Sequence, residues 1–209
     1  MDPFFTGMAP DTALELAELS RRMYALRETR KGLLASTGEA DADALLAALR
    51  AGRLPEHPAY DSWLSVIVLE RAEVALRTRI DWRCRHPRAE APSGADDDSG
   101  LSALLAEVSV PEAFASVQVH PDGVSFVGPG GLNVVARIAW AHDWAVEWHL
   151  DGRSWRLDTA PVAHPDVATR AHLHRPDGTV VADPLALETD NAAVVLQTVL
   201  DALARDALR

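Results

Sequence analysis

The sequence predicts an α+β fold, with an N-terminal helical hairpin or three-helix unit followed by an antiparallel sheet and a C-terminal helix. Apolar residues recur at helical spacing through residues 11–85, which is the pattern of amphipathic helices. From residue 114 onward they alternate with polar residues between short glycine-containing turns, as is typical of antiparallel strands. From residue 189 the helical spacing returns. These three successive patterns predict the order of the elements.

The first helix is expected to begin at Thr12, because Thr12 and Glu15 have the spacing of a capping box. Gly38 is expected to end it. Its apolar residues recur every three or four positions and form what we call the first-helix stripe: Leu16, Leu19, Met23, Leu26 and Leu33. We expect short neighbouring helices to leave part of this stripe uncovered, which predicts association with a partner helix or a second copy.

Two more helices follow in this part of the chain. Asp41 is placed to cap a short helix, and residues 55–58, which contain two prolines, are expected to form a loop. A third helix is expected from about Asp61 into Arg83, with its apolar residues on one face. The first two-fifths of the chain therefore predicts a helical module, residues 11–85.

Residues 86–100, HPRAEAPSGADDDSG, are rich in Pro, Gly, Ser and Asp and have no apolar period. This composition is typical of a linker. We therefore expect the chain to divide there, with an α+β domain over residues 101–209. A short helix is expected at 101–107, and the final helix is expected from Thr189 or Asp190.

Turn signals separate the expected strands of the second domain. They are PDG at 121–123, GPGG at 128–131, Asp151-Gly152, and a second PDG at 176–178. Between Trp144 and Leu150 the alternation of apolar and polar residues is strict. We expect an antiparallel meander of four to six strands, with the final helix covering one face of the sheet.

Charge and composition limit the classes of function. Residues 1–88 hold 13 basic and 13 acidic side chains, whereas residues 89–209 hold seven and 18, so the net charge of −11 belongs to the second half. Nucleic-acid binding by that half would need a local basic patch. The single cysteine, Cys84, excludes an internal disulfide. No long apolar run or signal-peptide pattern is present, so we expect a cytoplasmic protein without a membrane-spanning segment.

The polar residues at 156–174 form the candidate site. Strand spacing puts His172 and His174 on one face, and it does the same for Arg156 and Asp158. His164 lies between prolines at 161 and 165, which restrict the backbone around it. Such side chains can carry out metal-free phosphodiester cleavage, with histidine moving the proton and arginine neutralising phosphate charge. They can equally form a solvated polar sheet face, and the H-x-H pair can bind a metal.

The same segment resembles a known family. It reads R-x-D-x-A-P at 156–161, H-P-D at 164–166, T at 169, H-x-H at 172–174 and V-L at 195–196, after a strand and a DG turn. This order resembles the TumE family of toxins from toxin–antitoxin systems, which typically show R-W-D-N-A-P-H-H-P-E, then T-F-P-H-H-K-H, and a C-terminal helix. Some family positions differ here: Leu157, Thr159, Ala163 and Leu173 replace an aromatic, an asparagine and two histidines. The resemblance spans residues 148–196.

The resemblance implies a toxin whose catalytic candidates are Arg156, Asp158, His164, Thr169, His172 and His174. It implies an antitoxin protein as partner and RNA as a candidate substrate. The first-helix stripe, which lies outside the resemblance, is expected to bind that antitoxin or to form a homodimer. A metal-independent ribonuclease without a cofactor is the first hypothesis. The alternatives are a non-catalytic protein-binding or regulatory module, and a metal-dependent enzyme that uses the H-x-H pair. Catalysis requires these side chains to converge in one concavity.

Overall fold

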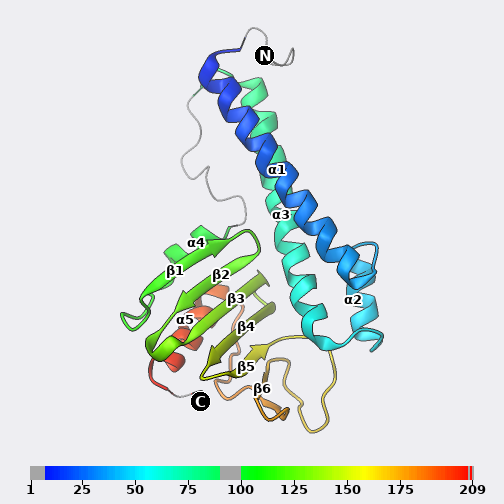
Figure 1. Cartoon of the computed structure of the whole chain (residues 1–209), viewed down its shortest axis with the longest axis vertical. Helices are drawn as coiled ribbons and strands as arrows, with labels where there is room; N and C mark the ends of the chain where they lie inside the picture. Colours follow the sequence, from blue (N-terminus) through cyan, green and yellow to red (C-terminus); the bar gives the residue numbers. More distant parts are fainter. Residues whose placement is uncertain (1–7, 90–99, 207, 209) are drawn as a thin grey trace.

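The computed structural model describes residues 8–89, 100–206 and 208. Its N-terminal part is helical, with α1 (Pro10–Thr37), α2 (Ala42–Arg50) and α3 (Glu56–Arg85). A short helix, α4 (Leu101–Ala106), precedes the sheet, and α5 (Ala192–Ala204) follows it. Figure 1 shows α1 and α3 lying side by side, with their far ends extending beyond the sheet. The predicted α+β class, with a helical N-terminal region and a C-terminal helix, is confirmed.

The sheet is an antiparallel meander in which each strand pairs with the next along the chain. Within the described residues it has seven strands: β1 (Ser116–His120), β2 (Gly123–Val127), β3 (Asn133–Trp140), β4 (Asp143–Leu150), β5 (Arg153–Asp158), β6 (His172–His174) and β7 (Val180–Ala182). The sequence predicted four to six strands, which was too few. The short strands β6 and β7, of three residues each, are the hardest to predict. Strands this short show almost no alternation in the sequence.

One hydrophobic core joins the helical part to the sheet. Tyr60 and Leu64 of α3, Val146 of β4 and Leu200 of α5 are fully buried members of the same cluster. α3 packs against β3 and β4, and α5 lies behind the sheet (Figure 1). Arg71 of α3 also donates to the carbonyl of Ala139 in β3. The N-terminal half of α3 is thereby held against the sheet.

The ends of the helices agree with some sequence expectations and correct others. Asp41 caps α2 by accepting from the backbone of Ala44 at 2.8 Å, and Gly38 ends α1 with a φ of 76°. Thr12, however, does not cap α1, which begins at Pro10. Its buried hydroxyl donates instead to the carbonyl of Pro87, 2.7 Å away, after the end of α3.

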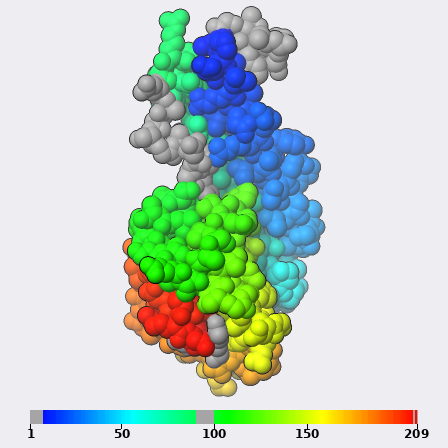
Figure 2. Space-filling view, turned by 60° about the vertical axis from the view of Figure 1, so that its left-hand side comes forward, coloured from blue at the N-terminus to red at the C-terminus, as the bar shows by residue number. Residues whose placement is uncertain are grey.

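The first-helix stripe is mostly covered inside the chain. Leu16, Leu19 and Met23 are buried, and Leu19 and Met23 form a small second core with Leu76 of α3. Leu26 and Leu33 are half-buried and pack against the two cores, so only part of the stripe faces solvent, and association through it stays a prediction. Figure 2 shows α1 rising above the body of the molecule, with its outer surface open to solvent.

The expected linker at 86–100 lies mainly outside the described residues, which resume at Gly100. Within the described ranges, none of the helices combines the length and apolar character needed to cross a bilayer.

Candidate functional site

Strand pairing brings four of the sequence-predicted residues together on one face of the sheet. In the register of β5 and β6, Arg156 lies opposite His174 and Asp158 lies opposite His172. Alternation along each strand then directs all four side chains to the face that α3 approaches. The sequence predicted only that each pair shares a face of its own strand. The structure shows that both pairs lie on the same face of the sheet.

The beginning of α3 supplies residues that sequence analysis missed. Glu56, His57 and Asp61 lie over this face. The bounds of α3 start at Glu56, but His57 has an extended backbone (φ −110°, ψ 132°), so the continuous helix begins at Pro58, close to the expected start near Asp61. Pro58 is the first residue of the continuous helix, and a proline there suits a helix start, since the first backbone N–H groups lack intrahelical partners. The sequence E-H-P at 56–58 was interpreted as part of the loop at 55–58, so Glu56 and His57 were not predicted as site residues.

Glu56 is the centre of a set of histidine contacts. Its carboxylate oxygens lie 2.9 Å from Nε2 of His164, 3.0 Å from Nε2 of His172 and 3.3 Å from Nε2 of His174. Three imidazoles from a loop and a strand thus direct the same ring nitrogen at one acid. We call Glu56, His57, Asp158, His164, His172 and His174 the histidine–carboxylate cluster.

Asp158 and His57 complete the cluster. Asp158 is fully buried and lies 3.4 Å from Nε2 of His172 and 3.5 Å from Nε2 of His174. His57 places its Nε2 3.4 Å from Nε2 of His174, and its Nδ1 lies 3.8 Å from Asp61. The side chain of His57 is 32% exposed, so it is the member of the cluster that solvent reaches most easily.

The position of His164 depends on the loop between β5 and β6. The backbone N–H of Val167 donates to the carbonyl of His164, and Asp166 has a positive φ of 65°, so the chain turns back directly after His164. The carboxylate of Asp158 accepts from the backbone of Ala160 at 2.8 Å at the start of the same loop. This turn brings His164 back over the sheet.

The ionisation of the cluster follows from its contacts. Burial alone raises the pKa of Glu56, but hydrogen bonds from His172 and His174 outweigh it and hold the pKa far below its ordinary value. Burial lowers the pKa of His172, yet the hydrogen bond to Glu56 and the charge of Asp158 raise it overall. A positive charge is therefore favoured at the centre of the cluster.

Arg156 is a buried bridge between the sheet and α3. Its Nε donates to Asp158 at 2.7 Å, and its Nη1 lies 2.6 Å from each carboxylate oxygen of Asp61. Burial raises the pKa of Asp61, but His57 and the charge of Arg156 lower it overall to about 2. The Nη2 of Arg156 is buried and has no hydrogen-bond partner among the described residues. Most of this guanidinium is thus committed to holding two acids in place.

A second buried contact fixes the first turn of α3. The hydroxyl of Tyr60 lies 3.0 Å from Oγ1 of Thr159, which also accepts from the backbone N–H of Trp144 at 3.0 Å. Burial raises the pKa of Tyr60 well above its ordinary value. The phenol therefore stays neutral and joins α3 to the ends of β4 and β5.

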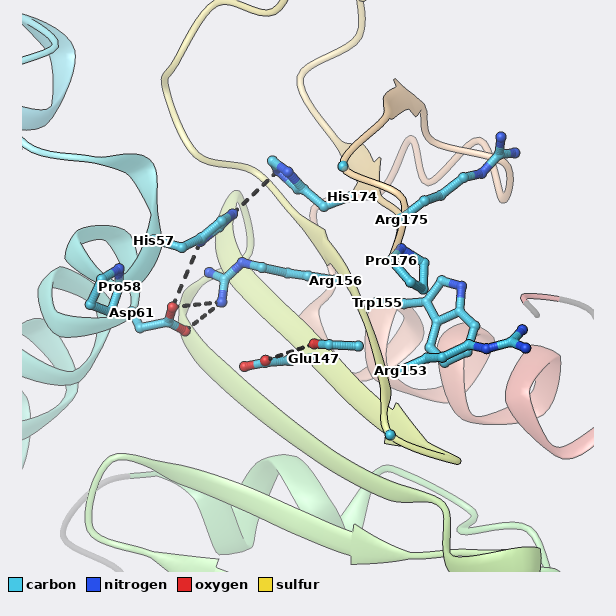
Figure 3. A pocket seen from close by; sticks show the side chains of 13 residues that line it. His57, Pro58, Asp61, Glu147, Arg153, Trp155, Arg156, His174, Arg175 and Pro176 are labelled. Atoms are coloured by element: carbon cyan, nitrogen blue, oxygen red, sulfur yellow. Dashed lines mark hydrogen bonds and ion pairs between the residues drawn. The ribbon is translucent and has the colours of Figure 1, made fainter.

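A pocket of about 720 Å³ opens beside the cluster (Figure 3). His57, Asp61, Arg156 and His174 lie at one side of it, and Arg153, Trp155, Arg175 and Pro176 lie at the other. Three of the seven basic residues in the acidic second half, Arg153, Arg156 and Arg175, line this one pocket. It is the kind of local basic patch that the charge distribution requires of any nucleic-acid contact.

The remaining sequence-predicted residue, Thr169, lies apart from these contacts. Its hydroxyl donates to the carbonyl of Ala171 at 2.8 Å, and its side chain is exposed. It supports the backbone just before β6. Arg156, Asp158, His164, His172 and His174 are thus brought together, while Thr169 has a place in the adjoining loop.

Comparison of the chain with family models, curated proteins and solved structures found no match.

Proposed function

We propose that the chain is a phosphodiester-cleaving enzyme, a toxin-like ribonuclease whose site is the histidine–carboxylate cluster and the pocket beside it. The observation that carries the proposal is the convergence of proton-transferring histidines and arginines on one concavity. Histidine is suited to proton transfer near neutral pH, and arginine to phosphate recognition. A polar sheet face without a binding role has no need to surround such a pocket with basic residues.

The chemistry follows from which cluster residues a substrate can reach. His172 is 2% exposed and Glu56 contacts three histidines, so these two position their neighbours. His57 lines the pocket and can receive the proton of a ribose 2′-hydroxyl on its imidazole ring. As that proton leaves, the 2′-oxygen forms a bond to phosphorus and the bond from phosphorus to the 5′-oxygen breaks. The leaving 5′-oxygen takes a proton from pocket water, and His57 later returns its proton to solvent.

The pocket favours an anionic ester over a neutral substrate. Arg153 and Arg175 are exposed at its rim, whereas Asp61 and Glu147 inside it already have partners in Arg156 and Ser154. Three arginines, Arg153, Arg156 and Arg175, line the pocket against two carboxylates, so the formal charge that a ligand meets is positive. RNA provides both the phosphates for these arginines and the internal nucleophile that the proposed reaction uses.

The test is cleavage of single-stranded RNA and growth arrest on expression. We expect His57→Ala to lower the cleavage rate by roughly 100-fold or more, because one proton-transferring group is lost. His120→Ala is the matched control, since His120 is exposed on β1 at the opposite edge of the sheet. The proposal fails if wild-type protein with a cooperative melt leaves RNA intact, or if both variants cleave equally.

As part of the toxin proposal, the N-terminal helices bind an antitoxin or a second copy. Most of the first-helix stripe is buried, so the surface offered to a partner is the solvent side of the hairpin, where Leu14, Tyr24 and Val74 are exposed. Light scattering of the full chain, alone and with Tyr24→Glu, measures self-association. A concentration-independent monomer would leave the antitoxin as the proposed partner and exclude the homodimer.

A further inference from the structure

We infer that Glu56, His164, His172 and His174 form a binding site for one divalent first-row transition-metal ion of the zinc class. These four residues each direct one ligand atom inward, and all four atoms lie within 4.8 Å of one another. The inference deepens the proposed function, because it concerns the same cluster, but metal binding can be measured without RNA. It also extends the alternative of a metal site at the H-x-H pair, for which the sequence alone predicted two ligands, His172 and His174.

The spacing of the ligand atoms fits a small coordination sphere. Metal bonds of about 2.0–2.2 Å place neighbouring ligands of a tetrahedral site about 3.3–3.5 Å apart. The contacts from Glu56 to the three Nε2 atoms, 2.9, 3.0 and 3.3 Å, are at or slightly below this spacing. The Glu56 contacts, made by its two oxygens, need only a slight expansion to admit an ion, and the whole set of ligand atoms lies within 4.8 Å.

The hydrogen bond behind His172 orients its ring for coordination. Nδ1 of His172 lies 3.1 Å from the carbonyl of Arg170, which can only accept, so Nδ1 carries a proton. In the neutral ring Nε2 then presents a lone pair towards Glu56, 3.0 Å away. A proton on Nε2 satisfies this contact as a hydrogen bond, and a metal ion bound between the two atoms would take the place of that proton. A backbone carbonyl behind a metal-binding histidine is a common second layer of support.

His164 provides an independent indication. Its Nε2 is buried and has no hydrogen-bond partner within the described residues, although it lies 2.9 Å from the Glu56 carboxylate. The angle of this contact therefore does not suit a hydrogen bond, but both atoms can face a common third point. The rings of His164 and His172 are 4.5 Å apart, and those of His172 and His174 are 4.9 Å apart.

The ligand types select the class of ion. Three imidazole nitrogens and one carboxylate suit zinc and its first-row neighbours, whereas magnesium and calcium prefer oxygen ligands. Asp158 lies close to His172 and His174 and adds negative charge beside the site. His174 also lines the pocket, so an ion bound there faces the proposed substrate. When bound, such an ion supplies positive charge to a phosphate oxygen.

The experiment uses the full chain freed of metal with a chelator and titrated with zinc by calorimetry. We expect one zinc per chain, and at least tenfold weaker binding by His164→Ala and Glu56→Gln. His120→Ala should bind as the wild type does. With cobalt as the probe, a four-coordinate site gives strong visible absorption that both variants lose. Wild-type protein that melts cooperatively but binds no zinc overturns the inference, as do variants that bind as tightly as His120→Ala.

Two further measurements separate the possible causes of a negative or positive result. If the variants do not fold, the thermal melt of the wild-type chain decides: zinc should raise it, whereas magnesium should not, and equal melts with both ions overturn the site. RNA cleavage by zinc-free protein without zinc binding would retain the proposed function and remove the metal. Stoichiometric zinc binding without RNA cleavage would retain the metal site and remove the proposed function.

Discussion

The guanidinium of Arg156 and the carboxylate of Asp61 join β5 to α3 through two 2.6 Å contacts made by one nitrogen. Ninety-five positions separate the two residues in sequence. On its other side Arg156 holds the fully buried Asp158. This three-residue bridge aligns the beginning of α3, which carries Glu56 and His57, with the histidines of β6. The site therefore depends on an ion pair that need not touch a substrate.

Replacing Arg156 should cost stability as well as activity. In Arg156→Met, Asp158 and Asp61 lose their main cation while they stay buried, and breaking a buried pair in this way typically costs about 3–5 kcal/mol. The free energy of unfolding from urea titration measures the effect. Arg153→Met, at an exposed position on the same strand, should change it by about 0.5 kcal/mol or less. Equal stability of the two variants would mean that the bridge is not structural.

Asp61 gives this bridge a defined pH dependence. Its pKa is about 2 in the folded chain against an ordinary value of 3.8, so the ionised group adds roughly 2 kcal/mol of stability. Because the folded pKa is depressed, this contribution is complete above about pH 5 and is lost as the pH falls from about 4 to 2. Asp61→Asn should therefore unfold more easily than the wild type at pH 7, and the gap should narrow near pH 3. A gap that stays constant over this range would contradict the assignment.

The local period of the sequence was enough to predict much of the fold and part of the site. Alternation along a strand puts Arg156 with Asp158, and His172 with His174, because side-chain direction in a strand depends only on position. That the two pairs face each other depends on the register of β5 with β6, which a three-residue strand does not reveal. Glu56, His57 and Asp61 were missed for a related reason, since their contacts with the sheet span about a hundred positions and leave no local pattern.

The hydrogen bond between Tyr60 and Thr159 should be measurable as a coupling energy. Both groups are buried, and a hydrogen bond of this type contributes about 1 kcal/mol. A double-mutant cycle with Tyr60→Phe and Thr159→Val, followed by urea unfolding, isolates the interaction from the other effects of each change. Thr159→Val alone should cost more than Tyr60→Phe, because it also removes the acceptor for the backbone of Trp144. A coupling energy near zero would mean that this contact does not fix the start of α3.

The arginines at the rim of the pocket should control RNA affinity and not the chemical step. Arg153 and Arg175 are exposed and line the side of the pocket away from His57, where they can contact phosphates next to the scissile bond. Each phosphate contact on single-stranded nucleic acid contributes about 0.7 to the slope of log K against log salt. In the His57→Ala background, where RNA stays intact, Arg175→Ala should weaken binding and lower this slope by about that amount.

The matched control for the rim arginines is Arg21→Ala. Arg21 is exposed on α1, where it pairs only with Glu18 among the described residues, and its loss removes the same charge from the chain. In the active protein, Arg175→Ala should raise KM and leave kcat nearly unchanged, because the contact is the same in the ground state and in the transition state. If Arg21→Ala reduces the salt slope as much as Arg175→Ala does, the attraction is one of overall charge, and the pocket has no specific part in binding RNA.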